Sequence, residues 1–169
     1  MACLAGFLVF VFRDPRRSVG QGIVAPADGR VRDVDPGGGY VSIYLALRNV
    51  HVTRSPIDGV VESASRTKGK HAPAFSRNTP HNERLEVSLQ TRVGTVKVVQ
   101  MTGAIARRIV PYIAEGQTVH KGDKLGLIRF GSRVDLYLPA SSVRIAIRKG
   151  ERLRAGVTSI AEVSDGSVE

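Results

Sequence analysis

Short runs of alternating apolar and polar residues fill most of the chain after residue 20, and Gly, Pro or Asp separates one run from the next. A period of two places every second side chain on the same face, which is typical of a half-buried β-strand. The clearest runs cover residues 29–34, 40–45, 85–89, 94–100 and 134–138. One weakly marked helix is expected near residues 103–113. The pattern therefore predicts a mainly β fold (β-rich α+β), with a barrel-sandwich-hybrid-like core of short strands and few helices.

Two kinds of turn motif punctuate the expected strands. Residues 26–29 and 56–59 both have the pattern Pro-x-Asp-Gly, in which Gly accepts backbone angles that a tight turn requires. Residues 115–128 resemble the hairpin of biotinyl and lipoyl carrier domains, which are barrel-sandwich hybrids, but lack the lysine that those carriers modify. The hairpin therefore supports barrel geometry and does not support a carrier function.

The apolar N-terminal segment suggests contact with a membrane. Residues 2–12 carry no charge, but a helix needs about 20 apolar residues to cross a bilayer. The segment either dips into a membrane or packs on the domain as a strand or helix, and we favour membrane contact. The basic flank that starts at Arg13 would then lie on the cytoplasmic side. The expected organisation is an apolar membrane-contacting segment over residues 1–17 and a single domain over residues 18–169, peripheral to the cell membrane or anchored in it at the cytoplasmic face.

The charge of the chain favours a polyanionic partner. Lys and Arg total 25 against 15 acidic residues, which gives a formal net charge of +10. An anionic membrane or a nucleic acid would suit this excess, although a solvated basic face would have the same composition. Only 5% of residues are aromatic and Trp is absent, which argues against a stacking surface for single-stranded nucleic acid. We therefore expect an anionic membrane surface as partner, and no nucleic acid. The basic residues that would contact lipid are Arg13, Arg16, Arg17, Arg107, Arg108, Arg144, Arg148 and Lys149.

Metal and disulfide chemistry is not expected. Cys3 is the only cysteine, so an intrachain disulfide and a thiolate cluster are excluded. The four histidines, His51, His71, His81 and His120, lack a metal-ligand spacing such as His-x-x-x-His. His120 belongs to the expected hairpin and should face solvent.

The residues with the most specific chemistry lie between residues 125 and 139. A Gly131–Ser132 pair between two β runs is by itself typical of a turn. Here the pair stands in the pattern Ile-x-Phe-Gly-Ser-Arg-Val-Asp-x-Tyr-Leu-Pro. This pattern closely resembles the processing site of the phosphatidylserine decarboxylase family, especially its short form, which includes archaetidylserine decarboxylases. Four more segments resemble motifs of that family in the same order, at residues 12–17, 25–29, 49–56 and 82–84.

The resemblance implies a proenzyme that cuts itself between Gly131 and Ser132. The Ser132 hydroxyl would attack the Gly131 carbonyl and convert the amide to an ester, and elimination followed by hydrolysis would leave a pyruvoyl group in place of Ser132. A β chain of residues 1–131 and an α chain of residues 132–169 would remain associated. The covalent pyruvoyl cofactor would then accept electrons as a serine phospholipid, phosphatidylserine or archaetidylserine, loses CO2 and becomes the ethanolamine phospholipid. Longer relatives also suggest a homodimer.

The resemblance also assigns roles to individual residues. Asp28, His51 and Ser132 would form the catalytic set, because a serine hydroxyl is a weak nucleophile and needs a base. We expect Asp28 to raise the pKa of His51. Longer members carry a second histidine where this chain has Arg54, so His51 would serve both self-cleavage and decarboxylation. Arg54 cannot act as a base near neutral pH and would bind the substrate carboxylate or phosphate.

Three neighbouring residues, Asn82, Glu83 and Arg84, match a family motif and would bind substrate. Glu83 and Arg84 could equally form a buried structural ion pair. His81 precedes them and could line the site.

Two other functions fit parts of the sequence. A non-catalytic barrel-sandwich module, associated with a membrane or nucleic acid, would use Gly131–Ser132 only as a turn. A pyruvoyl enzyme that acts on a soluble amino acid is the third candidate, but the apolar N-terminus and the basic charge count against it. An uncut chain without lipid activity would favour the binding module.

Overall fold

The protein is built almost entirely of strands, as the alternating sequence pattern predicts. The computed structural model describes residues 10, 13–69, 73, 81–104, 108–128 and 131–164. Within them it has fourteen strands. In chain order they are β1 (Ile23–Val24), β2 (Gly29–Asp35), β3 (Tyr40–Leu45), β4 (Val52–Arg54), β5 (Gly59–Thr67), β6 (Arg84–Thr91), β7 (Gly94–Met101), β8 (Ile109–Pro111), β9 (Thr118–Val119), β10 (Lys124–Ile128), β11 (Ser132–Tyr137), β12 (Val143–Ile145), β13 (Arg152–Leu153) and β14 (Ser159–Val163). The mainly β prediction is confirmed.

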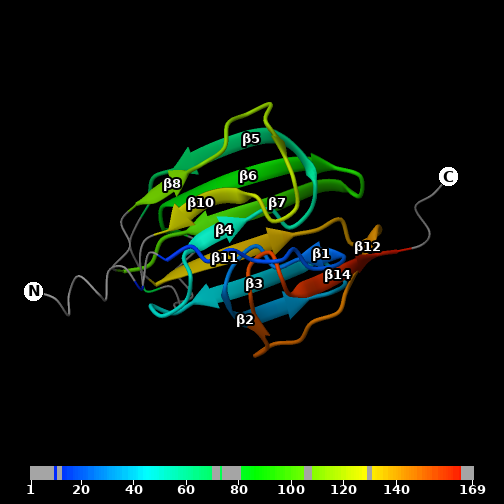
Figure 1. Ribbon diagram of the computed structural model, residues 1–169, viewed down its shortest axis with the longest axis horizontal. Helices are drawn as coiled ribbons and strands as arrows, with labels where there is room; N and C mark the ends of the chain where they lie inside the picture. Colours follow the sequence, from blue (N-terminus) through cyan, green and yellow to red (C-terminus); the bar gives the residue numbers. More distant parts are fainter. Residues whose placement is uncertain are drawn as a thin grey trace, which may run out of the picture.

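One large sheet carries most of the chain (Figure 1). Its eight strands are ordered β13-β2-β3-β11-β7-β6-β5-β9, and all neighbouring strands are antiparallel. Two smaller sheets have three strands each, in the orders β4-β10-β8 and β1-β14-β12. In Figure 1, β4 and β10 lie in front of β7 and β11, whereas β1 and β14 lie in front of β2 and β3. The small sheets therefore cover one face of the large sheet.

The core lies between the large sheet and its two covers. Side chains paired across neighbouring strands share a face, so Val134 lies beside Ile43, and Leu136 lies beside Val41. All four are fully buried and belong to one apolar cluster. We call this the inner face of the large sheet. Arg133, Asp135 and Tyr137 alternate with these residues and therefore lie on the opposite, outer face.

The five strand segments that the alternating pattern predicts are strands in the structure, except that Leu138 at the end of the last segment lies just beyond β11. Both Pro-x-Asp-Gly motifs bend the chain immediately before a strand, at residues 26–28 before β2 and 56–57 before β5. The expected helix over residues 103–113 is wrong for the part that can be compared, because residues 109–111 form strand β8. Ile109 is buried and pairs with Ile128 of β10, so pairing in the small sheet overrides a weak local helical preference.

Most of the apolar N-terminal segment, including Cys3, lies outside the described residues. Phe10 is described and exposed, and the Arg13 guanidinium lies 3.9 Å from the centre of its ring. Among the residues that are described, no helix is both long enough and apolar enough to cross a bilayer.

A matched pair of valine substitutions tests which face of the large sheet is the core. Val87 on β6 is 0% exposed, whereas Val60 on the neighbouring strand β5 is 42% exposed. Val87→Ala should lower the free energy of unfolding by about 2 kcal/mol, because it removes two buried carbon atoms and leaves a cavity. Val60→Ala should change it by no more than about 0.5 kcal/mol. Urea unfolding measures both, and equal losses would contradict the assignment of the inner face.

Candidate functional site

Ser132 lies in the middle of the large sheet, at the first position of β11. Its backbone pairs with Leu45 of β3 on one side. On the other side β11 pairs with β7, and the register that joins Arg133 to Met101 places Thr102 beside Ser132. The Ser132 side chain is on the inner face and is fully buried. Pairing with β3 at Ser132 itself, and with β7 from Arg133 onwards, therefore fixes the position of the serine.

His51 reaches the same end of the molecule through two short connections. Its carbonyl accepts a hydrogen bond of 3.1 Å from the backbone N–H of Ile128, at the end of β10. Three residues separate Ile128 from Ser132 along the chain. On the other side, residues 46–50 lead from Leu45, the strand partner of Ser132, to His51. The histidine and the serine are thus tied to neighbouring points of the fold although 81 positions (132 minus 51) separate them in the sequence.

The packing of β10 on β7 places His51 and Ser132 at the same end of the space between the small and the large sheet. A Cβ placed on Gly126 of β10 would lie 3.2 Å from the Oε1 atom of Gln100 on β7, so these two strands are in contact. Two residues after Gly126, β10 reaches Ile128, whose N–H bonds to the carbonyl of His51. Two residues after Gln100, the chain reaches Thr102, which follows β7 directly and lies beside Ser132. His51 and Ser132 therefore occupy the adjacent layer, between the same two sheets.

This layer holds buried polar atoms without partners. Among the described residues, neither ring nitrogen of His51 and neither amide atom of Gln100 has a hydrogen-bond partner, and the same holds for Oγ of Ser132. All three residues are 0% exposed. Leaving such a group buried and unpaired costs about 1–3 kcal/mol, so native proteins rarely do so without a functional reason. The concentration of unpaired groups here identifies the candidate active site.

Gly131 gives the backbone before Ser132 a conformation that favours glycine. Its φ is +54°, in the left-handed region where a Cβ introduces strain. Within the part of the chain that the structure describes, no heavy atom beyond its chain neighbours lies within 4 Å of the position that a Cβ would take. The space around Gly131 is therefore open, while Ser132 beside it is enclosed.

The pKa of His51 is lowered, contrary to the increase that the sequence suggested. Burial is the main cause, because it disfavours the charged imidazolium. The backbone of Asn49 and the negative charge of Asp28 act in the opposite direction but do not offset burial, and the positive charge of Arg13 lowers the pKa further. His51 is therefore neutral at neutral pH, with a ring nitrogen that can accept a proton.

Asp28 is held by Arg17 and not by His51. The Arg17 guanidinium pairs with both carboxylate oxygens, at 2.9 Å for the Nη2–Oδ2 contact, and the backbone N–H of Ala155 donates to Oδ1 at 2.8 Å. The Arg17 side chain is only 5% exposed. The sequence analysis placed Arg17 among the lipid-contacting residues, but the structure buries it against Asp28. Arg17 is the last residue of the family-like segment at residues 12–17, and this was the sequence feature that could have indicated such a role.

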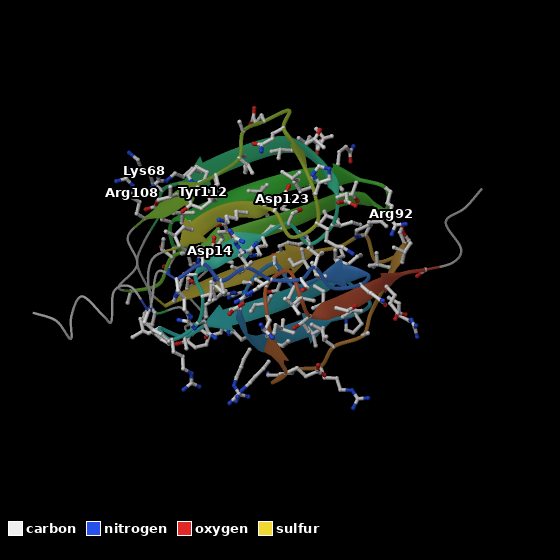
Figure 2. The ribbon with its side chains drawn as sticks, viewed as in Figure 1. Asp14, Lys68, Arg92, Arg108, Tyr112 and Asp123 are labelled. Carbon is white, nitrogen blue, oxygen red and sulfur yellow. The ribbon has the colours of Figure 1, made fainter. Side chains whose placement is uncertain are left out.

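Arg54 is occupied by contacts with the N-terminal segment. It pairs with Asp14 at 2.6 Å and donates to the carbonyl of Gly122 at 2.9 Å. Figure 2 shows Asp14 in front of the sheets, where Lys124 also reaches it. The structure thus gives Arg54 a role in fastening residues 13–17 to the domain, and its role as a substrate ligand stays a prediction.

The motif at residues 82–84 divides between the two faces of the sheet. Asn82 donates from Nδ2 to the carbonyl of Thr102 at 2.7 Å, so it supports the strand segment beside Ser132. The carbonyl of Glu83 accepts from the backbone N–H of Thr102 at 3.0 Å. Arg84 is instead paired in register with Met101 and lies on the outer face, away from Ser132.

The alternative that Glu83 and Arg84 form an ion pair with each other is wrong. Glu83 pairs with Arg66, and Arg84 pairs with Glu86 at 2.8 Å. His81 is exposed. His120 is also exposed, as expected, and its ring lies 3.6 Å from the Asp123 carboxylate.

Gln100 is a site residue that the sequence analysis missed. It closes the run 94–100 and was taken only as part of a half-buried strand. The alternation nevertheless contained the signal, because Val96, Val98 and Gln100 share one face and the two valines are fully buried.

An ion pair on the outer face anchors the strand that begins at Ser132. The Arg133 guanidinium contacts both carboxylate oxygens of Asp135 at 2.7 Å and donates to the hydroxyl of Tyr40 at 2.7 Å. Burial and the charge of Asp135 raise the pKa of Tyr40, so this hydroxyl stays protonated and can donate to Asp135 at 3.1 Å. The network therefore anchors the start of β11 from the outer face, while the Ser132 side chain lies on the inner face.

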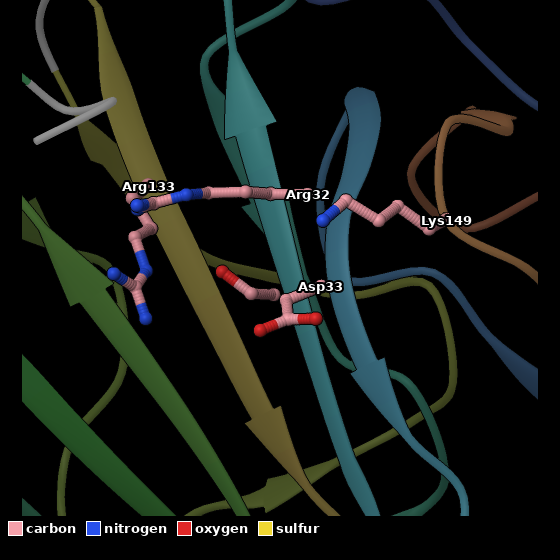
Figure 3. Close-up of a pocket in the computed structure, with 5 residues that line it drawn as sticks. Arg32, Asp33, Arg133 and Lys149 are labelled. Carbon is pink, nitrogen blue, oxygen red and sulfur yellow. The ribbon is translucent and has the colours of Figure 1, made fainter. Parts of the chain in front are cut away.

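A polar hollow adjoins this network. It has a volume of about 530 Å³ and is lined by Arg32, Asp33, Ser42, Arg133 and Lys149. Figure 3 shows Arg32, Arg133 and Lys149 around Asp33. Because the hollow is on the outer face, the sheet separates it from His51 and Ser132.

Comparison with known proteins identifies the family. The family model for phosphatidylserine decarboxylase matches residues 4–161. A phosphatidylserine decarboxylase proenzyme of Streptomyces avermitilis is 44% identical over 161 residues, which cover 93% of this chain and 74% of the relative. A Halobacterium salinarum protein, provisionally named an archaetidylserine decarboxylase proenzyme, is 45% identical over 94% of this chain and 82% of its own length. The chain belongs to the phosphatidylserine decarboxylase family.

The buried Arg133–Asp135 pair should contribute more to stability than an exposed pair of the same type. Asp135→Asn should lower the free energy of unfolding by about 3–5 kcal/mol, because it leaves Arg133 buried and uncompensated. The control is Glu162→Gln, which removes the exposed partner of Arg144 and should cost less than about 1 kcal/mol. Denaturant unfolding of both variants measures the difference. If Asp135→Asn costs no more than the control, the anchor assigned to β11 is wrong.

Proposed function

We propose that the chain is a proenzyme that cuts itself between Gly131 and Ser132 and then acts as a pyruvoyl-dependent decarboxylase of a serine phospholipid. The observation that carries the proposal is the enclosed layer in which the Ser132 hydroxyl and the His51 ring are both buried without polar partners. Membership of the phosphatidylserine decarboxylase family supports the decarboxylase activity. The self-cleavage and the pyruvoyl group are inferences from the residues present.

The residues around Ser132 fit the formation of a pyruvoyl group. The serine hydroxyl has no competing hydrogen bond among the described residues, and the flexible backbone of Gly131 lies next to it. The inner face excludes water from this position, which protects a reactive carbonyl from side reactions. When present, a pyruvoyl group supplies a carbonyl that takes up the electrons released as CO2 leaves the substrate.

Each residue of the candidate catalytic set has a distinct task in this proposal. His51 is neutral because of its burial, so it can accept the proton of the Ser132 hydroxyl as that oxygen attacks the Gly131 carbonyl. Asp28 favours the protonated histidine that results, since its charge acts on His51. Arg17 fixes the orientation of the Asp28 carboxylate and partly neutralises its negative charge. In the later reaction, a protonated His51 can return a proton to the substrate carbon.

The sheet topology supports association of the two chains after a cut. The β chain would end after β10, which pairs with β4 and β8, and the α chain would begin with β11, which pairs with β3 and β7. Strand β14 of the α chain also pairs with β1 of the β chain. We therefore expect the two chains to stay together without a covalent link.

Apolar and basic side chains near the candidate site support contact with an anionic membrane. Phe10 and Tyr112 are each 47% exposed and Leu47 is 42% exposed, and Leu47 belongs to the segment between Leu45 and His51. In Figure 2, Tyr112 lies close to Lys68 and Arg108 at one end of the molecule. Exposed apolar groups beside cations suit the interface of an anionic bilayer. We propose a peripheral or anchored location on the cytoplasmic face of the cell membrane.

Both phosphatidylserine and archaetidylserine remain in the proposal as substrates. Relatives named after each lipid match the chain at 44% and 45% identity. The two lipids share the serine headgroup in which the proposed chemistry occurs, so the same catalytic residues would act on both.

Ser132→Ala tests self-cleavage directly. Purified unmutated protein should give two masses, one ending at Gly131 and one beginning with a pyruvoyl group, because the serine oxygen is the proposed nucleophile. The variant should give one uncut mass, since alanine has no hydroxyl. Intact-mass spectrometry after incubation with anionic vesicles makes the comparison. A single uncut mass for the unmutated protein would refute self-processing and favour the non-catalytic binding module.

The pH dependence of self-cleavage tests the role of His51. The base is the neutral imidazole, so the cleavage rate should be maximal when His51 is neutral and should fall as pH drops through its pKa. Because burial lowers that pKa below its ordinary value of 6.5, the midpoint of the profile should lie on the acidic side of that value, and the rate should rise with pH through it and then level off. Gel quantification of the uncut chain at a series of pH values measures this profile. An apparent pKa above 6.5 would contradict a buried neutral histidine as the base.

A further inference from the structure

A second hollow lies beside Asp28 and the turn that leads to His51. It has a volume of about 660 Å³. Its lining comes from three segments, the start of β2, the turn after β3 and the chain around β13. Four of the lining residues are arginines: Arg30, Arg48, Arg152 and Arg154. We call this the arginine cavity.

The arginine cavity contains more positive charge than its own carboxylate can balance. Asp28 is the only acidic residue among the described residues that line it. That carboxylate is already engaged by Arg17 and by the backbone N–H of Ala155. Glu151, next to Arg152 in the sequence, accepts a hydrogen bond from the backbone N–H of Arg148 and does not line the cavity. The four lining arginines therefore face a space with no available anion from the described protein.

The strand register forces two of these arginines together. Arg152 of β13 pairs directly with Arg30 of β2, so their side chains leave neighbouring backbone positions on the same face of the sheet. Like charges directly opposite each other on adjacent strands are destabilising. The Arg30 guanidinium donates one hydrogen bond to the carbonyl of Gly150, which holds it near this position without neutralising it. A bound anion between the guanidinium groups would offset the repulsion.

The position of the cavity connects it with the candidate active site. Ala46 and Asn49 line it, and the segment between these two residues continues directly to His51. Asp28 also lines it and acts electrostatically on His51.

Arg30 and Arg133 both pair with Tyr44, and Arg152 pairs with Arg30, so the cavity arginines Arg30 and Arg152 lie on the outer face. A ligand held by them would lie on that face, at the end of the sheet where the chain turns towards His51.

We propose that the arginine cavity binds a phosphate group, and that the source of this group is the phosphodiester of the serine phospholipid headgroup. Planar guanidinium groups bind phosphate oxygens through pairs of parallel hydrogen bonds, and several arginines suit the two unesterified oxygens of a phosphodiester. The structure engages Arg54 with Asp14, so this cavity takes over the phosphate-binding role that the sequence suggested for Arg54. The lipid source rests on the proposed function, whereas the anion site itself does not.

Binding to the uncut Ser132→Ala protein tests the site without any need for activity. Isothermal titration with glycerophosphoserine, the soluble headgroup, should show saturable binding. An Arg152→Gln/Arg154→Gln variant should bind at least about tenfold more weakly, because it loses two charge-assisted contacts. The matched control is Arg92→Gln, which removes an exposed arginine from the β6–β7 turn and should leave the Kd unchanged. Figure 2 shows Arg92 at the end of the molecule opposite Arg108 and Tyr112.

Thermal unfolding provides a second readout that a purely structural role would not give. Without ligand, Arg152→Gln should unfold at the same or a higher temperature than the parent protein, because it relieves the repulsion with Arg30. With saturating glycerophosphoserine, the parent should gain stability and the double variant should not. A lower unfolding temperature for Arg152→Gln without ligand, combined with unchanged binding, would overturn the proposal.

Inorganic phosphate and vesicles distinguish the two sources of a phosphate group. Arginine-dependent binding of glycerophosphoserine, together with weaker sedimentation of the double variant on phosphatidylserine vesicles, would support the lipid headgroup. Arginine-dependent binding of inorganic phosphate alone would support the anion site and overturn the lipid source. No arginine-dependent binding of either probe would overturn both. Because the protein tested is uncut, a failure of self-cleavage in the unmutated chain would leave these outcomes interpretable.

Discussion

The hydrogen bonding of β11 on both of its edges is the constraint on which the rest of the structure depends. This strand joins β3 to β7 at the centre of the large sheet and begins at Ser132. Its inner residues enter the apolar core, and its outer residues form the ion pair between Arg133 and Asp135. Each face therefore holds the strand in a different way. Apolar packing holds its inner side chains in the core, whereas the ion pair and its hydrogen bonds hold its outer side chains on the other face. A serine at the first position of such a strand has little freedom to move, which would suit the proposed self-cleavage, because that reaction would require an accurate approach to the preceding carbonyl.

The interior beside this strand is less stable than an apolar interior of the same shape would be. His51, Ser132 and Gln100 bring polar atoms into a layer that is otherwise filled by aliphatic side chains, and these atoms find no partners among the described residues. Gly126 makes room for the Gln100 amide, because a Cβ there would press on the amide and on the carbonyl of Val110. The chain thus keeps a group of buried, unpaired polar atoms next to a well-packed core. Natural proteins often give up stability at the positions where they carry out chemistry.

Local sequence patterns predicted the strands well because alternation is a property of neighbouring residues. The same patterns could not assign partners that come from distant segments. Asp28 was singled out from the sequence, but its engagement by Arg17 depends on how the N-terminal segment crosses the domain. Arg84 belongs to a family-like motif, yet the register with Met101 turns it to the outer face, and its ion-pair partner is Glu86. The lowered pKa of His51 also required the structure, since burial outweighs the nearby carboxylate. Residues 109–111 form strand β8 instead of the expected weak helix, because pairing with β10 provides hydrogen-bond partners for their backbone groups.

The connection between β10 and β11 has a consequence for how the molecule folds and for whether it can refold. It is three residues long and joins a strand of the small sheet to the central strand of the large one. While it is intact, folding brings these two strands together within one chain, at a small entropic cost for closing a short loop. The proposed cut at Gly131–Ser132 would remove this link if it took place after folding. Any later unfolding would release two separate polypeptides, and recovery would become a concentration-dependent encounter between them. The lifetime of the cut protein would then be set by its unfolding rate, and a molecule that came apart would have to be replaced by new synthesis.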